Sequence, residues 1–428
     1  MGGGRKKLIK LFSTSVSSQV LLSGTSFLVN LLLIRYTSDT DYGLFILAQS
    51  AILLAITAQN SWMVGPLIGM AGQRQPEPRR QMIGAIFASS QRFLTRALLI
   101  LMPLAGIGYA IGRLNGLEAV VVAITLVAAW TALRRDFTRN LLLSYARPLT
   151  VLRADLFYVA LMVSGVVLAS ASPDFEAAIA VAGLTFAAWI AARIGHEALA
   201  ADPGWVVADA APYWKEMRSL AIWATTGAVI FWLFSQSYNY ILAARVDLTA
   251  VADVNASRML LMPAMLLTTG VRSLLGPMSV TWLTQLGLDR LLKRLAVFVV
   301  GIGVLQLIYF AALWLFRDWL TGDLMHREIG DRDRLIMLWA GVSLVSLCRE
   351  VTQCAVQAML RFEAMAYVTA ASALMALVLM WFGLDWWGPA AVIIAQIAGE
   401  FVMLVGVLVM LVIVRRERQR AAQVGVIG

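Results

Sequence analysis

The sequence is poor in the residues that most metal and redox sites use. Of its 428 residues only two are cysteine and two are histidine. Cys348 and Cys354 stand six residues apart in an apolar stretch, which turns them to different faces of a helix, so no disulfide is expected. With only His196 and His326 as imidazoles, neither a metal site nor any other cofactor is expected.

Charge is also scarce, and it is unevenly placed. Charged residues make up 14% of the chain, and no lysine stands in a GxxxxGK loop, so direct ATP drive is not encoded. The net charge of +10 gathers in alternate connecting segments, at 74–80, 134–147, 215–218, 290–294 and 415–420. This positive-inside pattern places both termini in the cytoplasm and argues against a nucleic-acid partner.

Long apolar stretches dominate the rest. Hydrophobic residues make up 60% of the chain, and its mean hydropathy is +0.77. A membrane-crossing helix needs roughly 20 such residues. About twelve suitable stretches are centred near residues 23, 57, 100, 125, 160, 186, 230, 268, 305, 344, 372 and 401. The sequence therefore predicts an all-α membrane protein with about twelve transmembrane helices.

The chain also repeats itself at an offset of about 210 residues. Arg135-Asp136-Phe137-Thr138, with Arg147 following, recurs as Arg349-Glu350-Val351-Thr352, with Arg361 at the same spacing. Two six-helix lobes are predicted, 1–200 and 219–428, joined by a cytoplasmic linker at 201–218. Twinned bundles of this kind are the usual build of a secondary transporter. The repeated charges Arg135, Asp136, Arg349 and Glu350 are either a cytoplasmic gate or a clamp that stabilises each bundle.

Two polar stripes run along predicted spans. In the first span, Gln19, Ser26 and Asn30 share a helix face with Ser15 and Ser23, and the seventh span offers Gln236 and Asn239. Lipid cannot hydrogen-bond these groups, so they face protein or water. The stripes are either helix-packing contacts or the wall of a water-filled path.

Three ionisable residues lie deep in predicted spans. Arg258 and Arg272, fourteen residues apart on nearly one helix face, need either acidic partners or an anionic substrate, and guanidinium suits phosphate. Glu400, near the centre of the last span, is either a proton-coupling site or the partner of an arginine such as Arg272. Asp155 is read as an interfacial pair with its neighbour Arg153.

The first predicted external turn carries a family resemblance. Asn30-Leu31-Leu32-Leu33-Ile34-Arg35, followed by Asp41-Tyr42-Gly43-Leu44-Phe45, resembles the polysaccharide flippases of the multidrug/oligosaccharidyl-lipid/polysaccharide exporter superfamily. The family typically has an apolar run ending in Arg, a short turn, then Tyr-Gly-x-[Phe/Tyr]. Tyr36-Thr37 stands here where Leu-Gly is common. The motif covers about 16 residues, whereas the predicted architecture covers nearly the whole chain.

The resemblance implies two lobes around a cationic cavity that opens alternately to each side of a bacterial inner membrane. The substrate would be a polyprenyl-diphosphate-linked oligosaccharide, with its diphosphate on arginines, its sugars on Gln, Asn and Tyr, and its tail in lipid. The chain would then be a monomeric flippase without covalent chemistry, working beside glycan polymerase or assembly proteins.

Three alternatives remain open at this point. A multidrug or metabolite antiporter of the same fold would favour acidic residues in its cavity. A membrane glycan polymerase or ligase would need a large external loop with catalytic acids, whereas this chain offers only the short Asp331-Arg332-Asp333 segment. A non-transporting scaffold of a glycan-assembly complex is the third.

Overall fold

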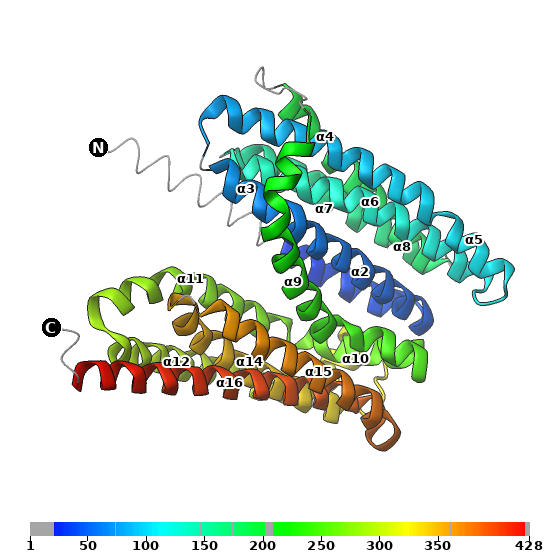
Figure 1. Cartoon of the computed structure of the whole chain (residues 1–428). Coiled ribbons are helices and arrows are strands. Elements are labelled where there is room, and N and C mark those ends of the chain that lie inside the picture. The colour runs from blue at the N-terminus through cyan, green and yellow to red at the C-terminus, as the bar shows by residue number, and fades with distance from the viewer. Residues whose placement is uncertain are drawn as a thin grey trace. The chain divides into compact units, whose positions relative to one another are not determined.

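The computed structural model of the chain describes residues 21–72, 74–145, 147–172, 175–201, 209–359 and 361–423. Within these ranges the regular secondary structure is helical throughout, without a strand (Figure 1). The predicted all-α fold is thereby confirmed for the described residues. Gln19 and Ser15 lie outside these ranges.

The chain packs into two compact units, Met1–Val229 (unit 1) and Ile230–Gly428 (unit 2). The helices of unit 1 are Leu21–Tyr36, α2 (Asp39–Gln59), η1 (Asn60–Val64), α3 (Gly65–Gly72), α4 (Pro76–Leu101), α5 (Pro103–Ala110), α6 (Gly116–Ser144), α7 (Pro148–Ser170) and α8 (Glu176–Ala200). Those of unit 2 are α10 (Leu248–Leu260), α11 (Met262–Leu286), α12 (Leu288–Leu315), α13 (Arg317–Trp319), η2 (Leu320–Leu324), α14 (Arg332–Ala358), α15 (Phe362–Trp387) and α16 (Ala390–Gln423). The division falls inside α9 (Ala211–Arg245), downstream of the predicted linker at 201–218.

The described helices include nine that are long and apolar enough to cross a bilayer. A tenth span is formed if the pair Leu248–Leu260 and Met262–Gly276, bent by 58°, crosses as one. The remaining two predicted centres, near 23 and 230, fall within Leu21–Tyr36 and α9. The chain is thus a multi-pass membrane protein, while the total of twelve spans and the cytoplasmic termini stay predictions.

The sequence repeat is also a repeat of helix starts. Ser38 caps α2 and Asp247 caps α10, each accepting a hydrogen bond from the backbone N–H three residues ahead. Arg147 precedes α7 and Arg361 precedes α15, with nearly equal backbone ψ angles of 53° and 51°. The two halves of the sequence therefore share local structure as well as residues.

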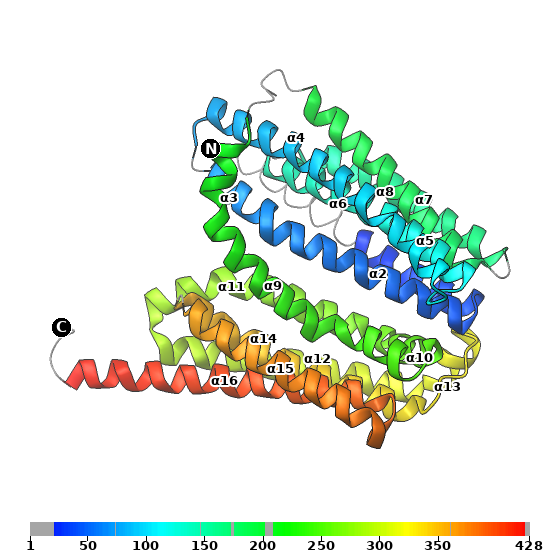
Figure 2. The same ribbon diagram turned by 45° about the vertical axis from the view of Figure 1, so that its right-hand side comes forward.

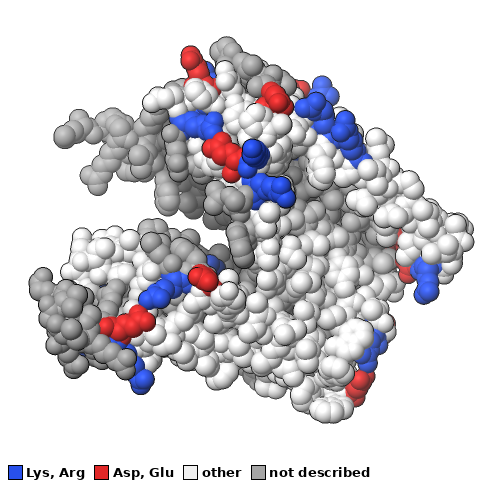
Figure 3. Space-filling model, viewed as in Figure 1, with Lys and Arg blue, Asp and Glu red and all other residues white. Residues whose placement is uncertain are grey.

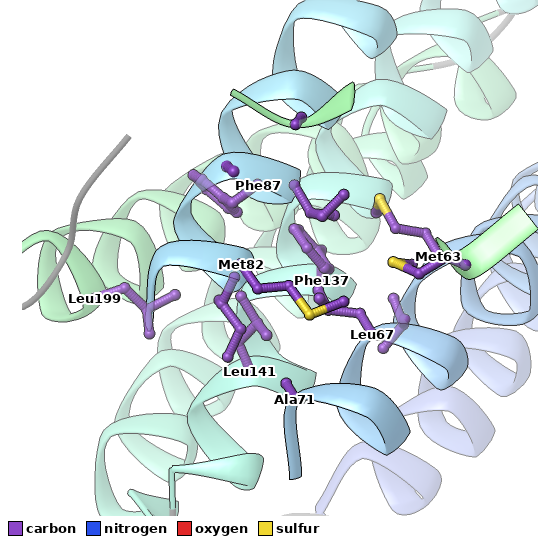
Figure 4. Packing of buried hydrophobic residues seen from close by; sticks show 14 of the residues in the cluster. Met63, Leu67, Ala71, Met82, Phe87, Phe137, Leu141 and Leu199 are labelled. Carbon is purple, nitrogen blue, oxygen red and sulfur yellow. The ribbon is translucent and has the colours of Figure 1, made fainter. Parts of the chain in front are cut away.

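The core of unit 1 forms where η1, α3, α4, α6 and α8 meet (Figure 4). Leu67, Met82, Phe137 and Leu141 are fully buried there. The neighbouring pair α7 and α8 approaches closely because Gly165 faces Gly183, and a Cβ on either would lie 2.7 Å from the other's Cα. Small residues that let backbones touch are typical of helix pairs in membranes.

In unit 2, α14 packs against α11, α12 and α16, and α15 lies along α16 (Figures 1 and 2). Leu275, Leu291, Val351 and Leu411 belong to the apolar cluster that joins α11, α12, α14 and α16. On the face of unit 2 seen in Figure 3, a broad uncharged surface separates the Lys, Arg, Asp and Glu side chains. That surface suits hydrocarbon, so the charged groups inside α14 need partners from neighbouring helices.

Candidate functional site

The repeated charged element of unit 2 is a buried ion-pair network centred on Arg349. This side chain is 4% exposed and donates through Nε to a carboxylate oxygen of Glu400 on α16, itself 7% exposed. It also donates to Glu350 at 2.9 Å and to the Oε1 of Gln353 at 2.7 Å. Three donors of one guanidinium are thus used by fixed acceptors on two helices.

Glu350 extends this network to α11. Its second oxygen lies 3.3 Å from Nη1 of Arg272, whose side chain is 38% exposed. Two arginines and two glutamates therefore balance in charge. Glu400 pairs with Arg349, whereas the sequence had offered Arg272 as an example of an arginine partner beside the alternative of a proton-coupling site. Arg272 is the outermost member and the one open to further contacts.

The counterpart in unit 1 is built differently. Arg135 donates to Asp155 on α7 at 2.6 Å, and Arg139 donates to the other oxygen of Asp155 at 3.1 Å. The Arg135 guanidinium also lies 3.7 Å from the ring centroid of Tyr158, a cation–π contact. The expected pairing of Asp155 with Arg153 is wrong, because the α6–α7 packing brings α6 arginines to this 1% exposed residue.

Asp136 stands apart from this pair. Asn140 donates to its carboxylate at 2.9 Å and to Asn60 of η1 at 3.4 Å. In the described part of unit 1, Asp136 has no salt bridge within 4.0 Å, although Arg135 and Arg139 act on it electrostatically. It is a half-buried carboxylate held by amides.

The polar stripe of unit 2 closes into an amide network. The Asn255 side-chain amide donates to Asn239 at 2.7 Å, and Asn239 donates to Gln236 at 3.3 Å. Tyr238, fully buried, donates its hydroxyl to Asn255 at 3.0 Å. Arg258 then donates to the Tyr238 hydroxyl oxygen at 2.9 Å. Predicted residues Gln236, Asn239 and Arg258 are thereby brought together.

Arg258 has an aromatic surrounding. Its guanidinium lies 5.9 Å from the Tyr238 ring centroid and 5.5 Å from that of Trp339. Among the described residues, no carboxylate forms a salt bridge with Arg258, and its side chain is partly exposed. It therefore keeps donors for an anionic group.

The stripe of unit 1 is satisfied locally. Asn30, buried, donates to the backbone carbonyl of Ser26 at 2.8 Å, and Tyr42 donates to Asn30 at 3.4 Å. Asp41 of the family-like turn accepts from the Ala177 backbone N–H at 2.9 Å, which caps the start of α8. The turn motif thus has a packing role in the described structure.

Sequence reasoning missed Tyr238, Asn255 and Trp339 as neighbours of Arg258. Asn255 stands three residues before Arg258 on α10, a spacing that places both on one helix face. This spacing could have identified Asn255 from the sequence. Trp339 comes from α14, and no sequence spacing indicated that its ring meets Arg258.

No protein-family model matches the chain, and no curated protein matches it in sequence. Solved structures do match in fold. An inward-facing multidrug resistance MATE family transporter of the MOP superfamily has a TM-score of 0.75 at 11% identity, covering 95% of this chain and 96% of that one. The lipid II flippase MurJ, inward closed, gives 0.69 at 11% identity, covering 94% and 87%.

A third similar structure is a MOP superfamily transporter from Pyrococcus furiosus, with a TM-score of 0.64 at 12% identity, covering 98% and 96%. At these identities the likeness shows the fold alone. The chain therefore has the fold shared by MATE transporters and MurJ over nearly its whole length.

Proposed function

We propose that the chain is a secondary-type transporter that moves a polyprenyl-diphosphate-linked oligosaccharide from the inner to the outer leaflet by alternating access. The setting would be the synthesis of a surface polysaccharide at a bacterial inner membrane. Arg258 carries the proposal, because it is a partly exposed cation without a carboxylate partner among the described residues. A guanidinium with free donors suits paired phosphate oxygens.

The neutralised acids of unit 2 support an anionic substrate over a cationic one. Glu400 and Glu350 both pair with Arg349, and Glu350 also meets Arg272. A cation arriving at either glutamate would compete with a guanidinium already in place. Arg272, by contrast, could share its exposed side with a second phosphate oxygen.

The test is lipid-linked glycan flipping by the full chain in proteoliposomes, read by the exposure of a fluorescent oligosaccharide to an external lectin. Arg258→Gln should lose most of the rate, and Arg258→Lys should retain an intermediate rate as a single-point cation. The exposed Arg290→Gln on α12 is the control and should keep the wild-type rate. Full flipping by Arg258→Gln would refute the phosphate role.

Asp136 favours a second candidate, the cation- or proton-coupled antiporter. Its carboxylate accepts a hydrogen bond from the neutral amide of Asn140, so it could take up a cation or a proton. Gradient-driven efflux of a cationic dye by wild type, lost in Asp136→Asn, would support this candidate. Absence of dye efflux would count against it.

The membrane enzyme finds least support. Three acids at and before the start of α14 are engaged by arginines: Asp318 and Asp333 contact Arg332 at 2.7 and 3.0 Å, and Asp331 contacts Arg334 at 3.2 Å. Carboxylates held in this way form a solvated charged cluster. We therefore propose transport without covalent chemistry.

A further inference from the structure

Unit 1 contains a cavity of about 740 Å³ that the charged networks do not use. Its walls come from α2, η1, α4, α6 and the part of α9 that belongs to this unit. Trp62, Met63, Phe93, Leu94 and Leu133 make most of the lining apolar. A cavity of this size and composition suits a small amphiphile.

Two cations line the cavity beside this apolar wall. Lys215 and Arg218 stand three residues apart on α9, and both are exposed. Glu216, the acid between them in sequence, is engaged by Arg74. Across the described chain, no carboxylate forms a salt bridge with either cation. Among the residues that the structure describes, the cavity edge therefore carries positive charge that no salt bridge compensates.

A buried polar group faces the same cavity. Gln59 is 9% exposed and donates its amide to the Leu133 carbonyl at 2.8 Å, while its Oε1 has no hydrogen-bond partner among the described residues. The Thr225 hydroxyl, also in the lining, is equally unpartnered in that part of the chain. An unpaired buried acceptor is costly. A ligand hydroxyl would satisfy Gln59.

The cavity is built by fixed elements. Trp214 donates its indole N–H to Ser89 at 3.1 Å, and Met217, fully buried, joins the core cluster, so the first turns of α9 are docked on unit 1. On the other wall, the π-helical η1 carries Trp62 and Met63. Single π turns inside α-helices are frequent at functional sites.

We propose that this cavity binds one anionic phospholipid with a hydroxyl-bearing headgroup, of the phosphatidylglycerol type. Its phosphate lies on Lys215 and Arg218, a headgroup hydroxyl donates to Gln59, and an acyl chain packs on Trp62 and Phe93. The phosphate, the headgroup hydroxyl and the acyl chain are thus each complementary to one chemical feature of the lining. This inference is independent of the proposed transport.

The test is native mass spectrometry of the delipidated full chain, titrated with phosphatidylglycerol, phosphatidylcholine of the same acyl chains, polyprenyl phosphate or sodium phosphate. Wild type should bind one phosphatidylglycerol about tenfold more tightly than phosphatidylcholine. Lys215→Gln/Arg218→Gln should lose that preference. Arg290→Gln/Lys293→Gln, an exposed Lys/Arg pair at equal spacing on α12, is the matched control and should keep it.

Two further comparisons separate the parts of the site. Phosphatidylmethanol has the same charge without headgroup hydroxyls, so wild type should bind it about threefold more weakly than phosphatidylglycerol, and Gln59→Leu should erase that difference. Brominated phosphatidylglycerol should quench part of the tryptophan fluorescence of the wild type. This part of the quenching should be absent in Trp62→Phe.

Three results would overturn the proposal. If the control pair Arg290→Gln/Lys293→Gln lost the preference equally, the preference would come from the overall positive charge of the protein and not from this cavity. Equally tight binding of sodium phosphate would make it a simple anion site. Tighter binding of polyprenyl phosphate would make it a polyprenyl site instead.

Discussion

The repeated arginine is neutralised by a different helix in each unit. In unit 2, Arg349 of α14 meets Glu400 of α16 and its own neighbour Glu350. In unit 1, Arg135 of α6 shares Asp155 of α7 with Arg139, and the neighbouring Asp136 bonds amides instead. One sequence element therefore builds a charge-balanced core in one unit and leaves a carboxylate without a salt bridge in the other, among the described residues.

The difference also concerns burial. The side chain of Arg349 is 4% exposed and that of Arg135 is 15% exposed, while their partners Glu400 and Asp155 are 7% and 2% exposed. Removing one partner of a buried pair leaves a charge in a medium that solvates it poorly. Asp155 keeps Arg139 when Arg135 is removed, whereas Glu400 has no second salt bridge among the described residues, so we expect unit 2 to depend more strongly on its pair.

The largest effect is expected from Arg349→Met, which leaves Glu400 buried without a cation. It should lower the free energy of unfolding by about 3–5 kcal/mol. Thermal unfolding of the purified protein in detergent measures this. The double variant Arg349→Met/Glu400→Leu should recover most of the loss, because both charges are gone. A double variant as unstable as the single one would contradict the ion-pair account.

The matching change in unit 1, Arg135→Met, should cost less, about 1–3 kcal/mol. Arg139 remains on Asp155, so the buried carboxylate keeps one cation. The same unfolding measurement applies. If the two substitutions were equally damaging, the proposed difference between the units would fail.

Helices α7 in unit 1 and α15 in unit 2 differ in how closely a glycine approaches its neighbours. Gly165→Ala in α7 should destabilise by about 1–3 kcal/mol, because the new Cβ meets the backbone of Gly183 at 2.7 Å. Gly383→Ala in α15 should cost about 1 kcal/mol or less, because its nearest neighbour is the Trp387 side chain at 3.1 Å, which can shift. If Gly165→Ala lowered the free energy of unfolding no more than Gly383→Ala, α7 and α8 would be able to separate without cost.

The smallest effects are expected at the second repeated arginine. Arg361 pairs with Glu417, and both are about half exposed, so Arg361→Gln should cost at most about 0.5 kcal/mol. Arg147 donates to the Ala198 carbonyl near the end of α8 at 3.0 Å, so Arg147→Gln should cost about 1 kcal/mol. Reversal of this order would mean that the Arg361 pair is more ordered than its exposure indicates.

Much of the fold could be predicted because its signals are local. The length of the apolar stretches predicted the helices. The Arg-acid-x-Thr repeat predicted two halves of similar structure, and the similar backbone angles before α7 and α15 agree with this. The ionic partners could not be predicted in the same way. Glu400 meets Arg349, and Asp155 meets Arg135, only because particular helix faces pack together.

The candidate site was predicted in part. The spacing that singled out Arg258 and Arg272 assumed one continuous helix, and this prediction is wrong: Arg258 lies on α10 and Arg272 on α11, and the two helices are bent by 58° at their junction. Arg258 joins the network of Asn239, Asn255 and Tyr238, whereas Arg272 joins Glu350. Spacing on one helix says which residues share a face. It does not say which neighbouring side chain that face meets.

The most direct test of the central claim, that the substrate is an anionic lipid-linked glycan, offers both substrate classes to the same proteoliposomes. With wild-type protein, the fluorescent polyprenyl-diphosphate-linked oligosaccharide should reach the external lectin, and a cationic dye should stay in place under an imposed proton gradient. Gradient-driven dye movement with no movement of the glycan would contradict the account.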